Sequence, residues 1–144
     1  MSVVLYESDN HVATITLNRP QKRNAIDEST CQALRAAWQR LDQSDDRVAI
    51  LTGAGDAAFC GGADIAEPPK DLASCLPGVG VVLDKPVIAA ISGWCVGGGG
   101  LFTLMCDLAI ATETARFAFP EPKLGVFGGV MTGLATRIPH KLAM

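Results

Sequence analysis

The sequence is poor in the residues that build metal centres and nucleic-acid surfaces. It has two histidines, His11 and His140, and its five cysteines include no pair in a C-x-C or C-x-x-C spacing. We therefore expect neither a metal site nor a disulfide framework, and interpret the cysteines as reduced, mostly buried thiols. Lysines and arginines number 12 against 15 aspartates and glutamates, without a basic run, which argues against a nucleic-acid partner. The first residues lack a basic segment followed by an apolar core, so we expect no secretory signal and a cytoplasmic protein.

One stretch has the length of a membrane span. The 21 residues from 86 to 106 carry no charge, and a helix of that length can cross a bilayer. Gly93 and the four glycines from 97 to 100 make a continuous helix costly, at roughly 1 kcal/mol for each glycine relative to alanine. We interpret the stretch as a buried strand, a glycine turn and a buried helix, and expect no membrane partner.

Short apolar runs alternate with one clear amphipathic helix. Residues 3–7 and 12–17, separated by polar residues, predict a hairpin. Asp27 is a candidate N-cap of a helix that ends near 44–46, and one face of this helix carries Leu34, Ala37, Trp38 and Leu41 at helical spacing. The other predicted elements are strands at 48–52, 87–91 and 108–111, a loop with local helix over 53–80, an extended stretch at 114–119, and helices from within 97–100 to about 107 and near 131–137. Strands that alternate with helices predict a single α/β domain over residues 1–144 with a mainly parallel sheet.

Two glycine-bearing segments, 59–65 and 93–100, each follow a predicted buried strand. Glycine lets backbone N–H groups approach a ligand closely. The second segment also opens a helix, where the first N–H groups lack partners. One N–H group from each segment would form an oxyanion hole, a pair of donors for a carbonyl oxygen that becomes negatively charged. The alternative is that these glycines only permit tight turns and close helix–strand packing.

A third glycine pattern points to another class of protein. Gly53, Gly55 and Ala58 follow the predicted strand 48–52 and fit the dinucleotide-binding fingerprint of a nicotinamide-dependent oxidoreductase. That fingerprint needs a helix directly afterwards, and the pairs at 61–62 (glycines) and 68–69 (prolines) would interrupt one. No acidic residue is evident at the end of a following strand. We therefore rank this interpretation below the oxyanion hole.

Four ordered segments together carry a resemblance to a known family. They read ITLNRP at 15–20 with Asn24-Ala25, LTG to FCGGADI over 51–65, KPVIAAISG to MCDLAIA over 85–111, and ARFAFPE with Leu124-Gly125 over 115–125. Their order and spacing resemble the enoyl-CoA hydratase/isomerase family, the crotonase superfamily, almost end to end. The resemblance implies a crotonase-type ββα spiral (ClpP/crotonase-like) and an enzyme of fatty acid metabolism that acts on an acyl-CoA or enoyl-CoA thioester. It implies no prosthetic group; coenzyme A is part of the substrate.

The resemblance also assigns residues to the chemistry. The family's two oxyanion-hole amides match Ala63 and Gly98, which would hold the thioester oxygen and stabilise an enolate. The family's glutamate after a proline matches Glu121, the candidate acid/base. Apolar neighbours such as Phe117 and Phe119 suit a carboxyl group that transfers protons near neutral pH. Without the family, a solvated loop carboxylate would be the favoured interpretation of Glu121.

Further residues would contact coenzyme A. Lys22 and Arg23 would lie near its phosphates, although an ordinary solvated turn explains them equally well. The backbone around Ala25 and along residues 63–65 (Ala63, Asp64 and Ile65) would contact the adenine end. A lysine often found in the family after the first glycine segment is replaced here by Ala66.

Departures from the family bear on the reaction. Leu101 stands where hydratases of the family carry a second glutamate. Adding water to a 2-enoyl-CoA benefits from two proton-transferring groups, whereas moving a 3-enoyl double bond to position 2 needs one, so the sequence favours an isomerase over a hydratase. Residues 128–131 (GGVM) replace the family's usual Pro-Gly turn after Gly125. A catalytically silent binder of CoA esters is the main alternative.

Length is the remaining departure. Family members continue past the position of Met144, and the region absent here would complete the spiral, close the site and build a trimer or hexamer from helical elements. We expect the chain to hold the family's core domain and to form that homo-oligomer only with the C-terminal region present.

Overall fold

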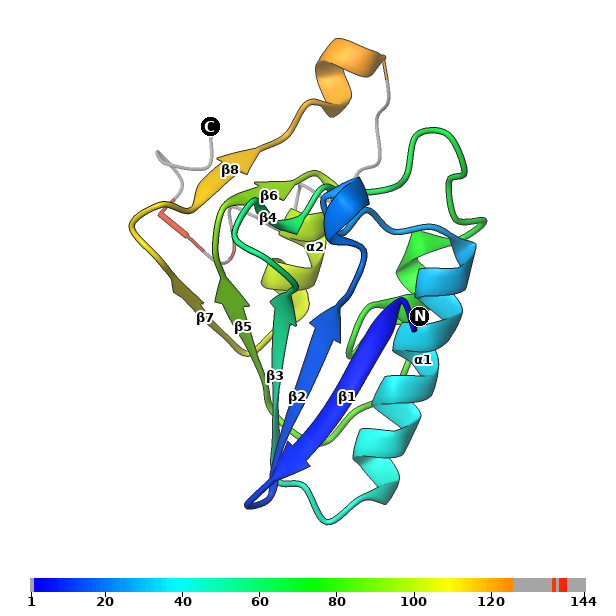
Figure 1. Ribbon diagram of the computed structural model, residues 1–144, viewed down its shortest axis with the longest axis vertical. Coiled ribbons are helices and arrows are strands. Elements are labelled where there is room, and N and C mark those ends of the chain that lie inside the picture. Colours follow the sequence, from blue (N-terminus) through cyan, green and yellow to red (C-terminus); the bar gives the residue numbers. More distant parts are fainter. Residues whose placement is uncertain (1, 126–135, 137, 140–144) are drawn as a thin grey trace.

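The computed structural model describes residues 2–125, 136, 138 and 139. Within this part, the chain forms a five-stranded sheet of order β1-β2-β3-β5-β7 and a three-stranded sheet of order β4-β6-β8 (Figure 1). The strands are β1 (Val4–Asp9), β2 (Val12–Leu17), β3 (Val48–Gly53), β4 (Ala58–Cys60), β5 (Val87–Ile91), β6 (Trp94–Val96), β7 (Leu108–Ala111) and β8 (Arg116–Ala118). The helices are α1 (Glu28–Gln43) and α2 (Gly98–Met105), with 3-10 turns η1 (Pro20–Lys22), η2 (Leu72–Cys75) and η3 (Glu121–Leu124).

The large sheet begins with the predicted hairpin. β1 pairs antiparallel with β2, and the two turn residues, Asn10 and His11, have φ angles of 49° and 65°. Two-residue hairpin turns of this kind match the twist of the strands. The remaining neighbours in the sheet, β2 with β3, β3 with β5 and β5 with β7, are parallel. The prediction of a mainly parallel sheet is confirmed.

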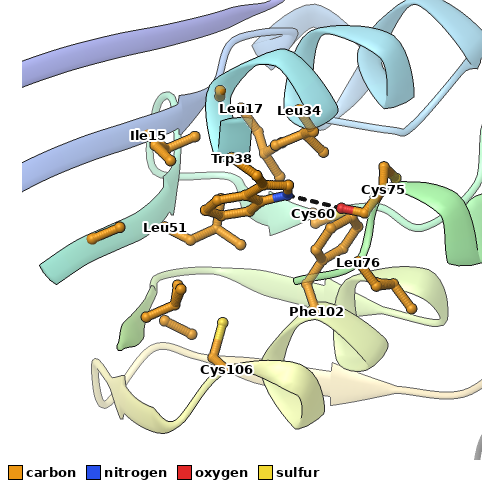
Figure 2. Close-up of a cluster of buried hydrophobic side chains, with 14 of the residues drawn as sticks. Ile15, Leu17, Leu34, Trp38, Leu51, Cys60, Cys75, Leu76, Phe102 and Cys106 are labelled. Atoms are coloured by element: carbon orange, nitrogen blue, oxygen red, sulfur yellow. Dashed lines mark hydrogen bonds between the residues drawn. The ribbon is translucent and has the colours of Figure 1, made fainter. Parts of the chain in front are cut away.

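Helix α1 connects β2 to β3 and forms one side of the core. Its predicted N-cap is confirmed, because Asp27 accepts a hydrogen bond of 2.8 Å from the Thr30 amide. The predicted apolar face is buried, and the Trp38 indole donates a 2.9 Å hydrogen bond to the Cys75 carbonyl (Figure 2). Burying a large apolar side chain contributes roughly 1.5–3 kcal/mol, so this face fixes η2 as well as the helix.

The chain moves repeatedly from the large sheet to the small one. β3 is followed by β4, β5 by β6, and β7 by β8, and the small sheet lies beyond the carboxyl ends of β3 and β5 (Figure 1). Strands β4 and β6 were not predicted; their residues were expected to form a loop and a glycine turn. Both strands have three residues and border glycines, so no hydrophobic period could develop. This spiral is what brings segments 61–64 and 97–98 side by side.

The stretch with the length of a membrane span divides as expected, into β5, a glycine turn with β6, and α2. Among the described residues, no helix is long and apolar enough to cross a membrane. β7 is confirmed as a strand, but all four of its side chains are exposed. The predicted helix near 131–137 and the turn at 128–131 lie outside the part that the structure describes, apart from Thr136.

Candidate active site

The first glycine segment holds Ala63 in an extended backbone. The Ile26 amide donates to the Gly62 carbonyl, and the Asp64 amide donates to the Ile26 carbonyl, both at 2.8 Å. Successive peptide groups of an extended chain point in opposite directions. The Ala63 N–H group therefore points away from Ile26, and it has no acceptor among the described residues.

The second glycine segment opens α2. Gly97 has φ 48° and ψ −111°, a conformation that only glycine adopts without strain. Its amide donates to the Ala118 carbonyl at 2.9 Å, and its carbonyl accepts from the Gly100 amide at 2.8 Å. The Gly98 amide has no acceptor within the described part of the chain, as expected for the first turn of a helix.

The two segments are in contact. A Cβ atom added to Gly98 would lie 3.5 Å from the Ala63 nitrogen and 3.6 Å from the Gly62 Cα. A Cβ added to Gly62 would lie 3.4 Å from the Gly98 nitrogen. The structure therefore brings together two backbone N–H groups that make no other hydrogen bond to described residues.

Glu121, the first residue of η3, adds a carboxyl group to the same place. A Cβ on Gly97 would overlap the Glu121 Oε1 and lie 3.3 Å from its Cδ. The Glu121 Oε2 is buried and has no hydrogen-bond partner among the described residues. The alternative interpretation of Glu121, a solvated loop carboxylate, does not fit this buried oxygen. Buried polar atoms are normally hydrogen-bonded, so a buried carboxylate oxygen without a donor marks a group available to a ligand.

An ion-pair network that the sequence did not reveal includes Asp64, the residue next to Ala63. The Arg19 Nη2 lies 3.1 Å from the Asp64 Oδ2 and 3.0 Å from the Asp27 Oδ2, and its Nη1 donates to the Ala25 carbonyl. All three charged side chains are nearly buried. The Asn24 amide donates to the carbonyls of Ala54 and Ala58. Arg19 therefore ties the start of α1 to the residue next to Ala63.

The pKa values of Asp64 and Asp27 are both lowered in this network. Burial alone would raise the pKa of Asp64, but the Ala66 amide and then Arg19 outweigh it and leave the pKa below its ordinary value. Burial likewise opposes ionisation of Asp27, and hydrogen bonds from Thr30 together with the Arg19 charge hold its pKa low. Both carboxylates are thus stabilised in the charged form.

The candidate coenzyme A residues lie beside this network. Lys22 and Arg23 are exposed, and the Lys22 Nζ is 3.8 Å from the Asp64 Oδ2. Ile65 is 84% exposed and the Ala63 side chain is also exposed. The carbonyl of Ala25 and the carboxyl group of Asp64 are occupied by Arg19, so their remaining atoms would have to contact a ligand.

The structure also bears on the dinucleotide fingerprint and on the position of Leu101. Strand β4 begins at Ala58, the last residue of the dinucleotide fingerprint, so the fingerprint is followed by a strand and lacks its required helix. Leu101 is 9% exposed and belongs to the hydrophobic core. Leu72 of η2 was not among the predicted site residues, yet its Cδ2 would lie 2.8 Å from a Cβ added to Gly98. No periodic signal in the sequence could have indicated that contact.

Taken together, fold and site define an α/β spiral protein in which two backbone amides without acceptors among the described residues lie beside a glutamate with one buried carboxylate oxygen. A family model for enoyl-CoA hydratase/isomerase matches residues 7–75 and 79–144, so the chain belongs to that family. It is 39% identical, over 98% of its length, to an (E)-benzylidenesuccinyl-CoA hydratase of Thauera aromatica, of which it covers 60%.

Solved structures agree. An enoyl-CoA hydratase of Mycobacterium marinum matches all of this chain with a TM-score of 0.88 and 33% identity, and 60% of that protein is covered. A carnitinyl-CoA hydratase of Mycobacterium avium matches 99% of this chain with a TM-score of 0.87 and 32% identity, and 59% of it is covered. The expected crotonase fold is confirmed. The chain spans about 60% of the length of these relatives.

Proposed function

We propose that this chain processes an acyl-CoA thioester by stabilising an enolate. The amides of Ala63 and Gly98 form the oxyanion hole, and Glu121 is the acid/base. The observation that carries the proposal is the meeting of two N–H groups and a buried carboxylate oxygen, none of which has a hydrogen-bond partner in the part of the chain that the structure describes. A thioester oxygen can accept from both N–H groups, and so recover the roughly 1–3 kcal/mol that an unsatisfied buried donor costs. The thioester has no donor for Glu121, whose part is to take a proton from carbon.

The chemistry follows from where charge develops. When Glu121 removes a proton from the carbon next to the thioester carbonyl, negative charge moves onto the thioester oxygen. Two N–H groups aimed at that oxygen stabilise the transition state more than the ground state, by roughly 3–4 kcal/mol for each donor in comparable sites. Returning the proton to C4 of a 3-enoyl group completes a double-bond shift.

One carboxyl group is enough for that shift. Glu121 takes the proton from C2 and delivers it to C4, so no net proton is consumed. Hydration would benefit from a second group that activates water, and the buried Leu101 cannot supply it. We therefore favour 3-enoyl to 2-enoyl-CoA isomerisation over hydration.

Coenzyme A binding is assigned to the turn before α1. Lys22 and Arg23 are exposed cations beside the first glycine segment, and their charges would face the phosphates of the cofactor moiety. The proposal that Ala25 and residues 63–65 contact the adenine end is supported by the exposure of Ala63 and Ile65, whereas Asp64 is buried. Exposed ion pairs are screened by salt, so their contribution to affinity is modest.

The decisive experiment compares Glu121→Gln with Glu113→Gln, an exposed glutamate in the turn between β7 and β8. Glu121→Gln keeps the shape but cannot accept the proton, and should lower kcat for 3-enoyl-CoA isomerisation by about 10²–10⁴-fold. Affinity for acetyl-CoA, measured by calorimetry, should change little in either variant. Glu113→Gln should behave as the unsubstituted chain does.

Two results would contradict the proposal. Equal turnover of the Glu121→Gln variant and the unsubstituted chain would remove Glu121 from the mechanism. Binding of acetyl-CoA without turnover of 3-enoyl-CoA or 2-enoyl-CoA in any variant would support the silent binder, the alternative that Leu101 favours.

A further inference from the structure

Two cysteines far apart in the sequence meet in the core. Cys31 lies in the first turn and a half of α1, and Cys75 ends η2. Their Sγ atoms are 3.0 Å apart, close enough for one thiol to donate a hydrogen bond to the other, and the residues are separated by 44 positions. Both side chains are buried, so the pair is enclosed by α1, η2 and the core.

We propose that Cys31 and Cys75 are a modification site that peroxide converts to a disulfide. The Cys31 sulfur attacks one oxygen of hydrogen peroxide, the O–O bond breaks, and sulfenic acid and one water result. The Cys75 sulfur then attacks the Cys31 sulfur, the S–S bond forms, the S–O bond breaks, and a second water leaves. Two thiols are oxidised and one peroxide is reduced.

The local chemistry selects Cys31 as the first sulfur to react. Its hydrogen bond with Cys75 lowers the pKa of Cys31, and its place near the amino end of α1 favours the thiolate further. The same hydrogen bond, followed by burial, raises the pKa of Cys75. Burial raises the pKa of Cys60 and of Cys106 to about 12, so those thiols stay protonated and unreactive.

The cysteine pair is connected to the candidate active site through η2, which carries both Cys75 and Leu72. Cys75 and Leu72 belong to the same single turn, and the Cys75 Sγ lies 3.2 Å from the Leu72 carbonyl oxygen, the alternative acceptor for its one proton. The Leu72 side chain lies against Gly98, at the place where an acyl group would meet the oxyanion hole. A disulfide would fasten η2 to α1 and hold Leu72 over Gly98. This consequence, unlike the disulfide itself, rests on the proposed function.

The test oxidises the reduced chain with hydrogen peroxide and maps the product. The unsubstituted chain should lose about 2 Da, yield a Cys31–Cys75 linked peptide, and gain roughly 10 °C in Tm because a long loop is closed. A thiol reductant should reverse all three changes. Cys31→Ser and Cys75→Ser should show none of them. Cys106→Ala, which also removes a buried thiol, should respond as the unsubstituted chain does.

Several results would overturn the proposal. They are addition of oxygen to Cys31 without a link, a link between other cysteines, and an unreactive chain. If either serine variant fails to fold, peptide mapping of the unsubstituted chain and of Cys106→Ala still decides the question.

A measurement of turnover tests the effect of the disulfide on catalysis separately from its formation. The oxidised chain should have kcat/KM for 3-enoyl-CoA lowered by several-fold, with recovery on reduction. A mapped disulfide with unchanged turnover would refute the coupling to Leu72 while the modification site stands. A mapped disulfide in a chain without turnover even when reduced would instead count against the proposed function.

Discussion

The two amides that meet at the candidate site are held in unlike ways. Ala63 lies in an extended segment with an exposed side chain, and its neighbour Asp64 is fixed by the Arg19 ion pair. Gly98 opens a helix in which an added Cβ on any residue from 97 to 100 would press on a neighbour. One donor therefore depends on polar side chains nearby, and the other depends on the absence of side chains. We therefore expect removal of a supporting polar side chain to impair the Ala63 donor only in part. An added methyl group in residues 97–100 should instead obstruct the site around the Gly98 donor directly.

Among substitutions in the two segments and their supports, the largest effect is expected from Gly97→Ala. The new methyl group would occupy the position of the Glu121 carboxyl, the flexible end of a side chain that can swing away. The positive φ of 48° adds strain of about 1–3 kcal/mol. We expect a folded protein with turnover reduced by at least about 10²-fold, measured as kcat for 3-enoyl-CoA together with Tm.

Gly55→Ala is the control for backbone strain. Gly55 has φ 75°, and an added Cβ would meet only the Pro20 Cβ, at 3.7 Å. Its Tm should fall as much as that of Gly97→Ala, with turnover nearly unchanged. Equal turnover in the two variants would show that the space beside Gly97 is not used in catalysis.

Much of the fold was predictable because its pattern is local. The Leu34 to Leu41 face of α1 repeats at helical spacing, and the Asp27 cap is readable from one residue type before that face. The strands β4 and β6 could not be predicted, because three residues such as Ala58–Cys60 show no period. They are strands only because the spiral supplies a partner.

The candidate site also has residues that the sequence indicates and residues that only the packing reveals. The roles of Gly98 and Glu121 are predicted through the resemblance to the family, without which Glu121 would be interpreted as a solvated loop carboxylate. The burial of Arg19, the contact of Leu72 with Gly98 and the meeting of Cys31 with Cys75 depend on how distant segments pack. Arg19 looks like an ordinary loop cation in the sequence, because nothing local shows that two carboxylates 8 and 45 residues away surround it.

Arg19→Met should have an intermediate effect. It removes the cation from between Asp27 and Asp64 and leaves two nearly buried carboxylates unpaired. Because Asp64 is next to Ala63, we expect kcat to fall about tenfold and Tm by roughly 5–10 °C. Arg47→Met is the matched control, since Arg47 is exposed and makes no ion pair with the described residues.

The pH dependence sharpens this prediction. The pKa values of Asp27 and Asp64 are lowered in the folded chain, so the unfolded chain binds protons more tightly. Their stabilisation is complete above the ordinary aspartate pKa of about 4, and is lost as the pH falls through the lowered values. The Tm difference between the unsubstituted chain and Arg19→Met should therefore shrink between pH 7 and pH 3. A constant difference would mean that Arg19 acts through packing alone.

The smallest effect is expected from Ala63→Ser, which changes the exposed side chain and leaves the backbone amide in place. Turnover should stay within about threefold, and stability within about 0.5 kcal/mol. Gly98→Ala is its counterpart: the added methyl lies 2.8 Å from the Leu72 Cδ2 and 3.5 Å from the Ala63 nitrogen, between the two donors. It should lower turnover at least about tenfold, although alanine favours a helix by roughly 1 kcal/mol over glycine. If Ala63→Ser lost as much turnover as Gly98→Ala, the side chain at position 63 rather than its amide would be the group that meets the substrate.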